Sequence, residues 1–267
     1  MPTAENNPIK FEDGAAYEKM MGVWSQLVGS QFIDWLKPAE GQHWIDVGCG
    51  NGAFTEQIIE RCSPVQICGI DPSNAQIDFA KKRPLAQAAD FQTGDAMKLP
   101  FERDCFDFAT MALVIFFVTE PTKGVAEMKR VVRPGGTVAA YVWDIYSGGL
   151  PMEPCHAALR SMNIQYPLPP SPEASKLEVL EDLWTEAGLR AIETKKIKVE
   201  RTFDSFQDFW DITCNSPALQ PVLADLSPAS LERLTSVVQK HMPADPNGKI
   251  TYSAHANAIK GVNLGAE

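Results

Sequence analysis

Apolar positions first recur at helical spacing and then alternate in short blocks along the chain. From Tyr17 to Trp35 the apolar residues are spaced three or four apart, which predicts an amphipathic helix that ends before Pro38. Strands are then predicted at 43–47, 65–71, 89–94, 105–112 and 137–143, separated by helices at 53–62, 73–83 and 120–132. This alternation predicts an α/β fold with a doubly wound, mostly parallel sheet.

The pattern is less regular after Trp143. Residues 146–172 are rich in Pro and Gly and are expected to cross the carboxyl edge of the sheet without regular structure. A helix at 174–187, a strand at 190–200, a helical stretch at 203–242 and a last strand at 249–260 follow. We therefore divide the chain into a disordered tail (1–14), an N-terminal cap helix (15–36), an α/β domain (37–200 and 248–267) and a helical substrate lid (201–247).

Charge and cysteine content narrow the class of partner and the compartment. The formal net charge of −10 argues against nucleic acid or an anionic membrane as the main partner. The longest apolar run, 106–118, is too short to span a bilayer, and the polar N-terminus gives no sign of a signal peptide. The six cysteines form no CxxC pair and have no spacing suited to a metal site, so we expect a reduced, cytoplasmic protein without a metal ion.

A glycine-rich turn after the first predicted strand is the main candidate for a ligand site. Gly48, Gly50 and Gly52 allow a sharp bend and a close approach of the backbone to a ligand. Asp46, Asp71 and Asp95 stand at the ends of three successive strands. Since parallel strands end at one edge of the sheet, these carboxylates are expected to line one crevice. Asp71 lies where an acid grips ribose hydroxyls, although it could also cap the helix that follows it.

The same glycines also satisfy the fingerprint of dinucleotide-binding proteins, which favours an NAD(P)-linked oxidoreductase. A dinucleotide would place a pyrophosphate at the turn, where Asp46 would repel it. We also expect no Arg or Lys near the turn. S-adenosylmethionine carries a sulfonium and an ammonium and no phosphate, so the acidic surroundings favour it as the cofactor, with S-adenosylhomocysteine as the product.

Five motifs in the predicted order and spacing resemble the class I S-adenosylmethionine-dependent methyltransferases, in particular the small-molecule "type 11" group. They are the glycine turn (46–52), Gly69-Ile-Asp71, Gly94-Asp95-Ala96, Leu99-Pro-Phe101 followed by Phe106-Asp107, and Arg133-Pro-Gly-Gly136. The resemblance implies seven strands in the order 3-2-1-4-5-7-6, with the last strand antiparallel. It also implies that the N-terminal helix closes over the cofactor. The candidate cofactor contacts are Asp46, Gly48, Cys49, Gly50, Gly52, Asp71, Pro72, Ser73, Asp95, Ala96, Met97, Met111, Tyr17, Met21 and Trp24.

The catalytic and acceptor residues are less well marked. Methyl transfer from a sulfonium needs positioning more than a strong base. Some relatives carry a histidine where this chain has Ile115-Phe116-Phe117, and His156 is then the one histidine placed to reach the crevice. The expected acceptor is a small, partly apolar molecule methylated on oxygen, nitrogen or carbon, and the protein a monomer or homodimer. A cofactor-binding regulator without catalysis is an alternative. Candidate walls of the acceptor pocket are Trp143, Tyr146, Met152, Phe206 and Trp210.

Overall fold

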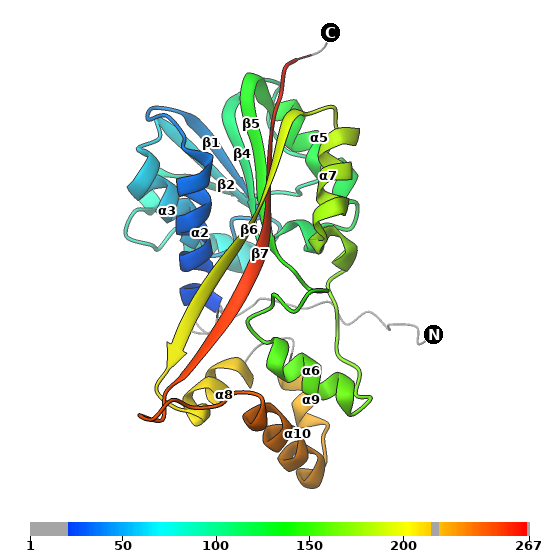
Figure 1. The fold of residues 1–267 in the computed structure, drawn as a ribbon. Coiled ribbons are helices and arrows are strands. Elements are labelled where there is room, and N and C mark those ends of the chain that lie inside the picture. The colour runs from blue at the N-terminus through cyan, green and yellow to red at the C-terminus, as the bar shows by residue number, and fades with distance from the viewer. Residues whose placement is uncertain (1–20, 215–218, 266–267) are drawn as a thin grey trace.

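A seven-stranded sheet forms the centre of the protein, and its order confirms the predicted fold class (Figure 1). The computed structural model describes residues 21–214 and 219–265, so the predicted tail and Tyr17 lie outside the described residues. The order is β3-β2-β1-β4-β5-β7-β6, and β7 pairs antiparallel with both β5 and β6. The strands are β1 (His43–Val47), β2 (Gln66–Asp71), β3 (Asp90–Thr93), β4 (Phe106–Ala112), β5 (Val132–Trp143), β6 (Arg190–Phe203) and β7 (Ile250–Val262).

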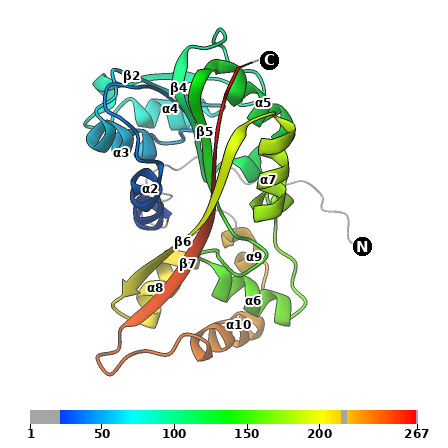
Figure 2. The ribbon, with the colours of Figure 1, turned by 45° about the horizontal axis from the view of Figure 1, so that its top comes forward.

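Helices cover both faces of this sheet, with α2 and α3 on one side and α5 and α7 on the other (Figures 1 and 2). Among the described residues the α-helices are α2 (Val23–Leu36), α3 (Ala53–Cys62), α4 (Asn74–Ala80), α5 (Pro121–Val131), α6 (Glu153–Ser161), α7 (Leu177–Glu186), α8 (Phe206–Cys214), α9 (Gln220–Ala224) and α10 (Pro228–Lys240). Short 3-10 helices are η2 (Ala86–Ala88), η3 (Ile115–Phe117) and η4 (Pro172–Ser175). No helix in these ranges is long and apolar enough to cross a membrane.

The last two strands continue beyond the sheet as a two-stranded ribbon. The pairing of β5 with β7 ends at Trp143 opposite Ala256, whereas β6 and β7 stay paired as far as Phe203 and Ile250. Figures 1 and 2 show this ribbon leading to a separate group of helices that includes α8 and α10. The ribbon therefore joins the α/β body to the helices that we expected as a lid.

Three expectations about local structure are wrong. Phe203 ends β6 and does not begin a helix, because it continues the alternation of buried residues along the ribbon. The stretch 146–172 contains α6, which packs against α10. Arg133–Gly136 belongs to β5, where Phe106 pairs with Val132 but Phe108 pairs with Thr137. The expected turn is therefore an outward bulge at the start of the strand, not a separate connection.

Candidate cofactor and acceptor site

Hydrogen bonds and left-handed backbone fix the glycine turn between β1 and α3. The amides of Gly48 and Cys49 both donate to the carbonyl of Ile70 on β2, at 2.7 and 2.9 Å. Gly48, Gly50 and Gly52 have φ angles of 75°, 52° and 81°, which residues other than glycine rarely adopt. The three glycines therefore allow the turn to lie against the carboxyl end of β2.

Open space adjoins this turn at Gly50 but not at Gly48. A Cβ atom on Gly48 would come within 2.5 Å of the Val114 side chain, which follows β4. A Cβ atom on Gly50 would meet nothing within 4 Å. A ligand can thus approach the backbone at Gly50. Val114 was not among the expected site residues, although its position two residues after a buried central strand indicates the same sheet edge.

Asp46 is a fully buried acid with one unsatisfied oxygen. Its Oδ2 atom accepts a hydrogen bond of 2.6 Å from the hydroxyl of Thr55, while its Oδ1 atom has no partner among the described residues. Burial raises the pKa of Asp46 to about 7; the Thr55 hydrogen bond opposes the rise and the nearby charge of Asp71 adds to it. A cation placed beside Asp46 would favour the carboxylate and supply the missing electrostatic partner.

Asp71 connects the glycine turn to the start of α4. Its two carboxylate oxygens accept hydrogen bonds from the amides of Gly50 and Ser73, at 3.0 and 2.9 Å. The hydroxyl of Ser73 in turn accepts from the Gln76 amide at the first turn of α4. Burial raises the pKa of Asp71, and the two amides partly oppose that rise. The structure therefore brings Asp46, the glycines, Asp71 and Ser73 together, and Pro72 lies within the same connection.

The third acid lies at the same sheet edge but in a more open position. Asp95 is exposed and its carboxylate accepts a hydrogen bond of 2.8 Å from the Met97 amide. The preceding Gly94 donates its amide to the carbonyl of Asp71 at 3.1 Å, which ties this turn to the end of β2. Ala96 and Met97 are half-buried. All three predicted acids therefore lie along one edge of the sheet.

The expectation that no basic residue approaches the turn is wrong. The Cδ atom of Arg83 would lie 3.2 Å from a Cβ atom on Gly52. Arg83 comes from the segment after α4, and this tertiary approach leaves no mark in the local sequence. Its Nε atom pairs with Glu56 at 2.9 Å, so its positive charge is locally neutralised.

The remaining expected cofactor contacts are buried. Met21 and Trp24 are almost completely buried, and the Trp24 ring packs 6.2 Å from the ring of Tyr252 on β7. Cys49 is buried as well, and burial raises its thiol pKa well above the usual value. Met111 is buried, and its Cε atom would lie 3.4 Å from a Cβ atom on Gly124 in α5. This packing against α5 gives no support to a ligand contact by Met111.

The five expected pocket walls do not form one cluster. Phe206 and Trp210 pack together on α8 with 5.9 Å between ring centroids, and Trp143 and Met152 are buried. Tyr146 is 48% exposed, and its hydroxyl donates to Glu173 on the 3-10 helix η4. Tyr146 therefore lies on an outer surface, whereas the other four are buried or half-buried.

His156 lies on α6 in the helical part of the protein. Its ring is buried and stacks on Tyr166 at 4.1 Å, and neither ring nitrogen has a hydrogen-bond partner among the described residues. Burial, with a smaller contribution from the Arg160 charge, lowers the pKa of His156 to about 3. The ring is therefore neutral at physiological pH and a weak proton acceptor in this conformation.

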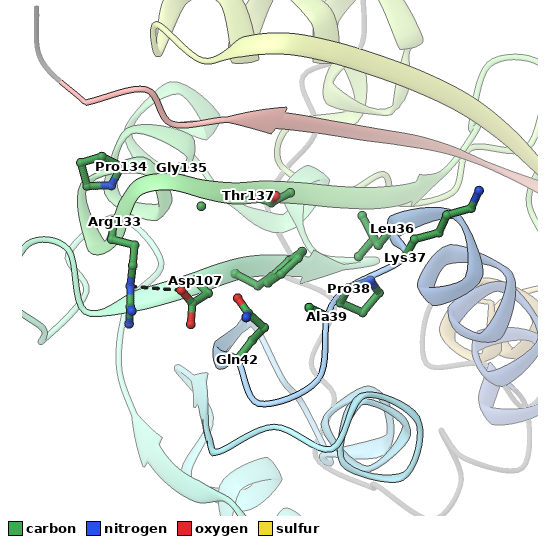
Figure 3. Close-up of a pocket in the computed structure, with 12 residues that line it drawn as sticks. Leu36, Lys37, Pro38, Ala39, Gln42, Asp107, Arg133, Pro134, Gly135 and Thr137 are labelled. Atoms are coloured by element: carbon green, nitrogen blue, oxygen red, sulfur yellow. Dashed lines mark ion pairs between the residues drawn. The ribbon is translucent and has the colours of Figure 1, made fainter.

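A cavity of about 430 Å³ lies at the opposite edge of the sheet (Figure 3). Its lining includes Gln42, Asp107 and Arg133, from the amino ends of β1, β4 and β5. Asp107 is engaged there by Arg133 at 3.2 Å and by the His43 amide at 2.8 Å. None of the expected site residues lines this cavity. Within the described ranges no group of acidic, His or Cys side chains could hold a metal ion.

Comparison with known proteins gives the same assignment as the geometry. Residues 45–140 match a family model described as a methyltransferase domain. This match and the order of the strands support a class I S-adenosylmethionine-dependent methyltransferase domain in this chain. It is 36% identical over 121 residues to a ubiquinone/menaquinone biosynthesis C-methyltransferase of Paracoccus denitrificans, covering 44% of this chain and 48% of the relative.

Two further similarities extend over more of the chain. An O-methyltransferase of Pyrenophora dematioidea is 33% identical over 174 residues, covering 63% of this chain and 61% of the relative. A solved Haemonchus contortus phosphoethanolamine N-methyltransferase, in complex with phosphomonomethylethanolamine and S-adenosylhomocysteine, has a similar fold. Its TM-score is 0.58 at 19% identity, covering 94% of this chain and 56% of that chain. The chain thus spans less than two thirds of the length of these relatives.

Proposed function

We propose that this protein transfers the methyl group of S-adenosylmethionine to a small, partly apolar acceptor. The observation that carries the proposal is the buried Asp46 carboxyl, which has one unpaired oxygen and stands two residues before a glycine turn that is open at Gly50. A cationic ligand suits this site, since it would compensate a charge that the protein itself leaves unpaired. The matching methyltransferase family model over residues 45–140 supports the same cofactor.

The described residues fit this cofactor by the chemistry of their side chains. Asp71 has remaining acceptor capacity for ribose hydroxyls, since each of its two oxygens accepts one backbone hydrogen bond and can accept a second. Asp95 and the half-buried Met97 would hold the adenine side. Asp46 would hold the positive charge through the electrostatic field of its carboxylate. In this assignment the glycine turn has no side chains that would block the cofactor, and its backbone fixes the orientation of the cofactor.

When bound, the cofactor supplies a methyl carbon whose bond to sulfur breaks as the acceptor atom bonds to that carbon, the electron pair remaining on sulfur. The residues of the chain contribute orientation and exclusion of water. Leu113, the residue after β4, has a φ of 63°, which is a costly conformation for a non-glycine residue. The next residue, Val114, lies against Gly48. No proton transfer by a named side chain is required for an acceptor that is already nucleophilic.

Calorimetric titration of S-adenosylmethionine into the full chain tests the cofactor assignment. We expect saturable binding by wild type and a loss of roughly tenfold or more in affinity for Asp71→Asn, which removes a charged hydrogen-bond acceptor. Asp90→Asn is the matched control, because Asp90 is exposed and begins β3 at the far edge of the sheet. Absence of binding by wild type would refute the proposal.

A regulator that binds the cofactor without turnover is the second candidate. It is favoured by η3, which lies two residues beyond β4 and whose three residues carry no titratable side chain. Formation of S-adenosylhomocysteine should be measured with small phenols, amines and 1,3-dicarbonyl compounds, which represent oxygen, nitrogen and carbon acceptors. Product with any of them supports methyl transfer. Tight cofactor binding without product supports the regulator.

A further inference from the structure

One face of α6 carries polar atoms that are buried without partners. Glu153, His156 and Arg160 are spaced three and four residues apart, so they share one side of the helix. Within the described part of the chain, both ring nitrogens of His156 and the Oε2 atom of Glu153 have no hydrogen-bond partner. Three such atoms on one helical face form a cluster that the cofactor site does not use.

The residues next to this cluster already have hydrogen-bond partners of their own, so they do not pair with the three free atoms. Arg160 pairs with Glu153 and donates a 2.7 Å hydrogen bond to the hydroxyl of Tyr166. The Tyr166 ring stacks on the His156 ring with an angle of 14° between the two planes. Arg160 and Tyr166 thus fix the imidazole in place and leave its nitrogens available.

The cluster adjoins the boundary between the helices and the α/β body. Tyr252, on the ribbon strand β7, is close enough to Glu153 for that charge to raise its pKa, after the larger effect of burial. The Tyr252 hydroxyl donates to the carbonyl of Leu150 at 3.4 Å, and its ring packs on Trp24 of α2. Tyr252 therefore links the polar face of α6 to the helix that we expect to close over the cofactor.

Leaving these atoms unsatisfied is costly. An unpaired buried donor or acceptor costs on the order of 1–3 kcal/mol, and a buried polar network is tolerated when every member is paired. Native proteins keep such atoms where a ligand or water completes the hydrogen bonds. The aromatic rings of Tyr166 and Tyr252 next to the cluster favour a ligand with a flat, apolar body.

We propose that Glu153 and His156 bind a hydroxyl group of a neutral, aromatic acceptor and so position it for methyl transfer. This inference rests on the proposed function, whose acceptor class it specifies. The N–H of the neutral imidazole donates to the hydroxyl oxygen, and the hydroxyl group donates its hydrogen to Oε2 of Glu153, which takes that proton when this oxygen is the atom that is methylated. His156 is on this basis an acceptor-binding residue, with no proton gained or lost.

The charges at the cluster select against ionic acceptors. Glu153 and Arg160 already neutralise each other, so a carboxylate or an ammonium group would be buried here without a counter-charge of its own. A hydroxyl group matches the imidazole N–H donor and the Glu153 Oε2 acceptor, which are both free. An acceptor lacking the hydroxyl would leave the same atoms unpaired, which gives a strong basis for discrimination.

The test uses the full chain saturated with S-adenosylhomocysteine, phenol as the probe and toluene as its apolar counterpart. Binding is followed by the ¹⁵N chemical shifts of the His156 ring as a function of probe concentration, and these shifts give the affinity. We expect phenol to shift the His156 signals and His156→Phe to weaken phenol binding roughly tenfold. Toluene affinity should change less than twofold. His241→Gln is the matched control, because His241 is exposed on the neighbouring helical segment.

Each outcome decides between a ligand site and a structural histidine. Phenol that leaves the His156 ring signals unmoved, or that binds wild type and His156→Phe equally, overturns the proposal. If His156→Phe does not fold, phenol and toluene are titrated into Glu153→Gln and into wild type, and the phenol affinities of these two proteins are compared instead. A protein that binds phenol at His156 but no S-adenosylhomocysteine would support this site and refute the proposed function.

Discussion

Replacing Asp46 by Asn removes the charge that we expect to attract the cofactor while keeping the size of the side chain. Asp46 is fully buried, has one free oxygen and has its pKa raised to about 7, chiefly by burial. The free protein is therefore close to half protonated at this residue near neutral pH. A cationic ligand would bind preferentially to the ionised form and would lower this raised pKa.

The size of the effect follows from the titration. With a pKa of about 7, Asp46 is ionised in roughly one tenth of molecules at pH 6 and nine tenths at pH 8. The affinity of wild type for S-adenosylmethionine, divided by that of Asp46→Asn, should then rise about tenfold over this interval. The α-amino group of the cofactor also titrates here, but it does so equally for both proteins and cancels in the ratio.

Stability of the free protein should change in the opposite direction. Because burial raises this pKa above its unfolded value, the contribution of Asp46 to stability is present at low pH and is lost as pH rises through about 7. The loss amounts to roughly 3 kcal/mol between pH 5 and pH 8. Asp46→Asn lacks this pH dependence, so the difference between its unfolding free energy and that of wild type should vary by that amount.

Calorimetry at pH 6, 7 and 8 measures the affinity ratio, and urea unfolding of the free proteins measures the stability. Thr55→Val provides a second check, because loss of its hydrogen bond should raise the pKa of Asp46 and move the midpoint of both curves to higher pH. An affinity ratio that stays constant across this range would refute the electrostatic role assigned to Asp46.

Four further substitutions test the glycine turn, the packing of the sheet and the base of the ribbon. Gly48→Ala should destabilise the protein by about 1–3 kcal/mol and weaken cofactor binding, because its Cβ atom would come within 2.5 Å of Val114 at a φ of 75°. Gly50→Ala adds only the backbone strain, so its urea midpoint should fall less. Trp184→Phe should lower the unfolding free energy by about 1–3 kcal/mol, since it removes a buried 3.0 Å hydrogen bond to a carbonyl of β5. Asp144→Ala should loosen the base of the ribbon, where Lys196 pairs with it at 3.3 Å, and increase proteolysis there without changing the far-ultraviolet circular dichroism spectrum.

The parallel sheet and its acidic edge were predictable because both depend on local patterns, whereas the strand order was predicted from the resemblance to the methyltransferase family. A buried parallel strand needs a nearly continuous apolar run, and its carboxyl end is marked by the residue that follows the run. Asp46, Asp71 and Asp95 each lie within two residues of a strand's carboxyl end, and parallel pairing of β1 with β2 and of β2 with β3 brings them to one edge. Alternation of strands and helices was thus sufficient to predict the sheet and the positions of these acids.

The ribbon and the helical part were less predictable because different periodicities overlap there. Phe203 fits a helical spacing with Phe206, but it also continues the alternation of Ile197 and Val199. Tertiary pairing with β7 decides for the strand. In α6 the proline at position 154 occupies the first turn, where a missing amide costs nothing, so its presence did not exclude a helix.

Arg83 shows why one part of the electrostatic argument needed the structure. Considered alone, an arginine against Gly52 would favour a phosphate at the turn and strengthen the case for a dinucleotide. Glu56 neutralises that arginine in a largely buried pair, whereas Asp46 and Asp71 have no cationic side chain among their recorded partners. The local balance at the turn is therefore negative despite the nearby guanidinium. A ligand carrying a sulfonium and an ammonium gains from this balance, and a diphosphate would add two more negative charges to it.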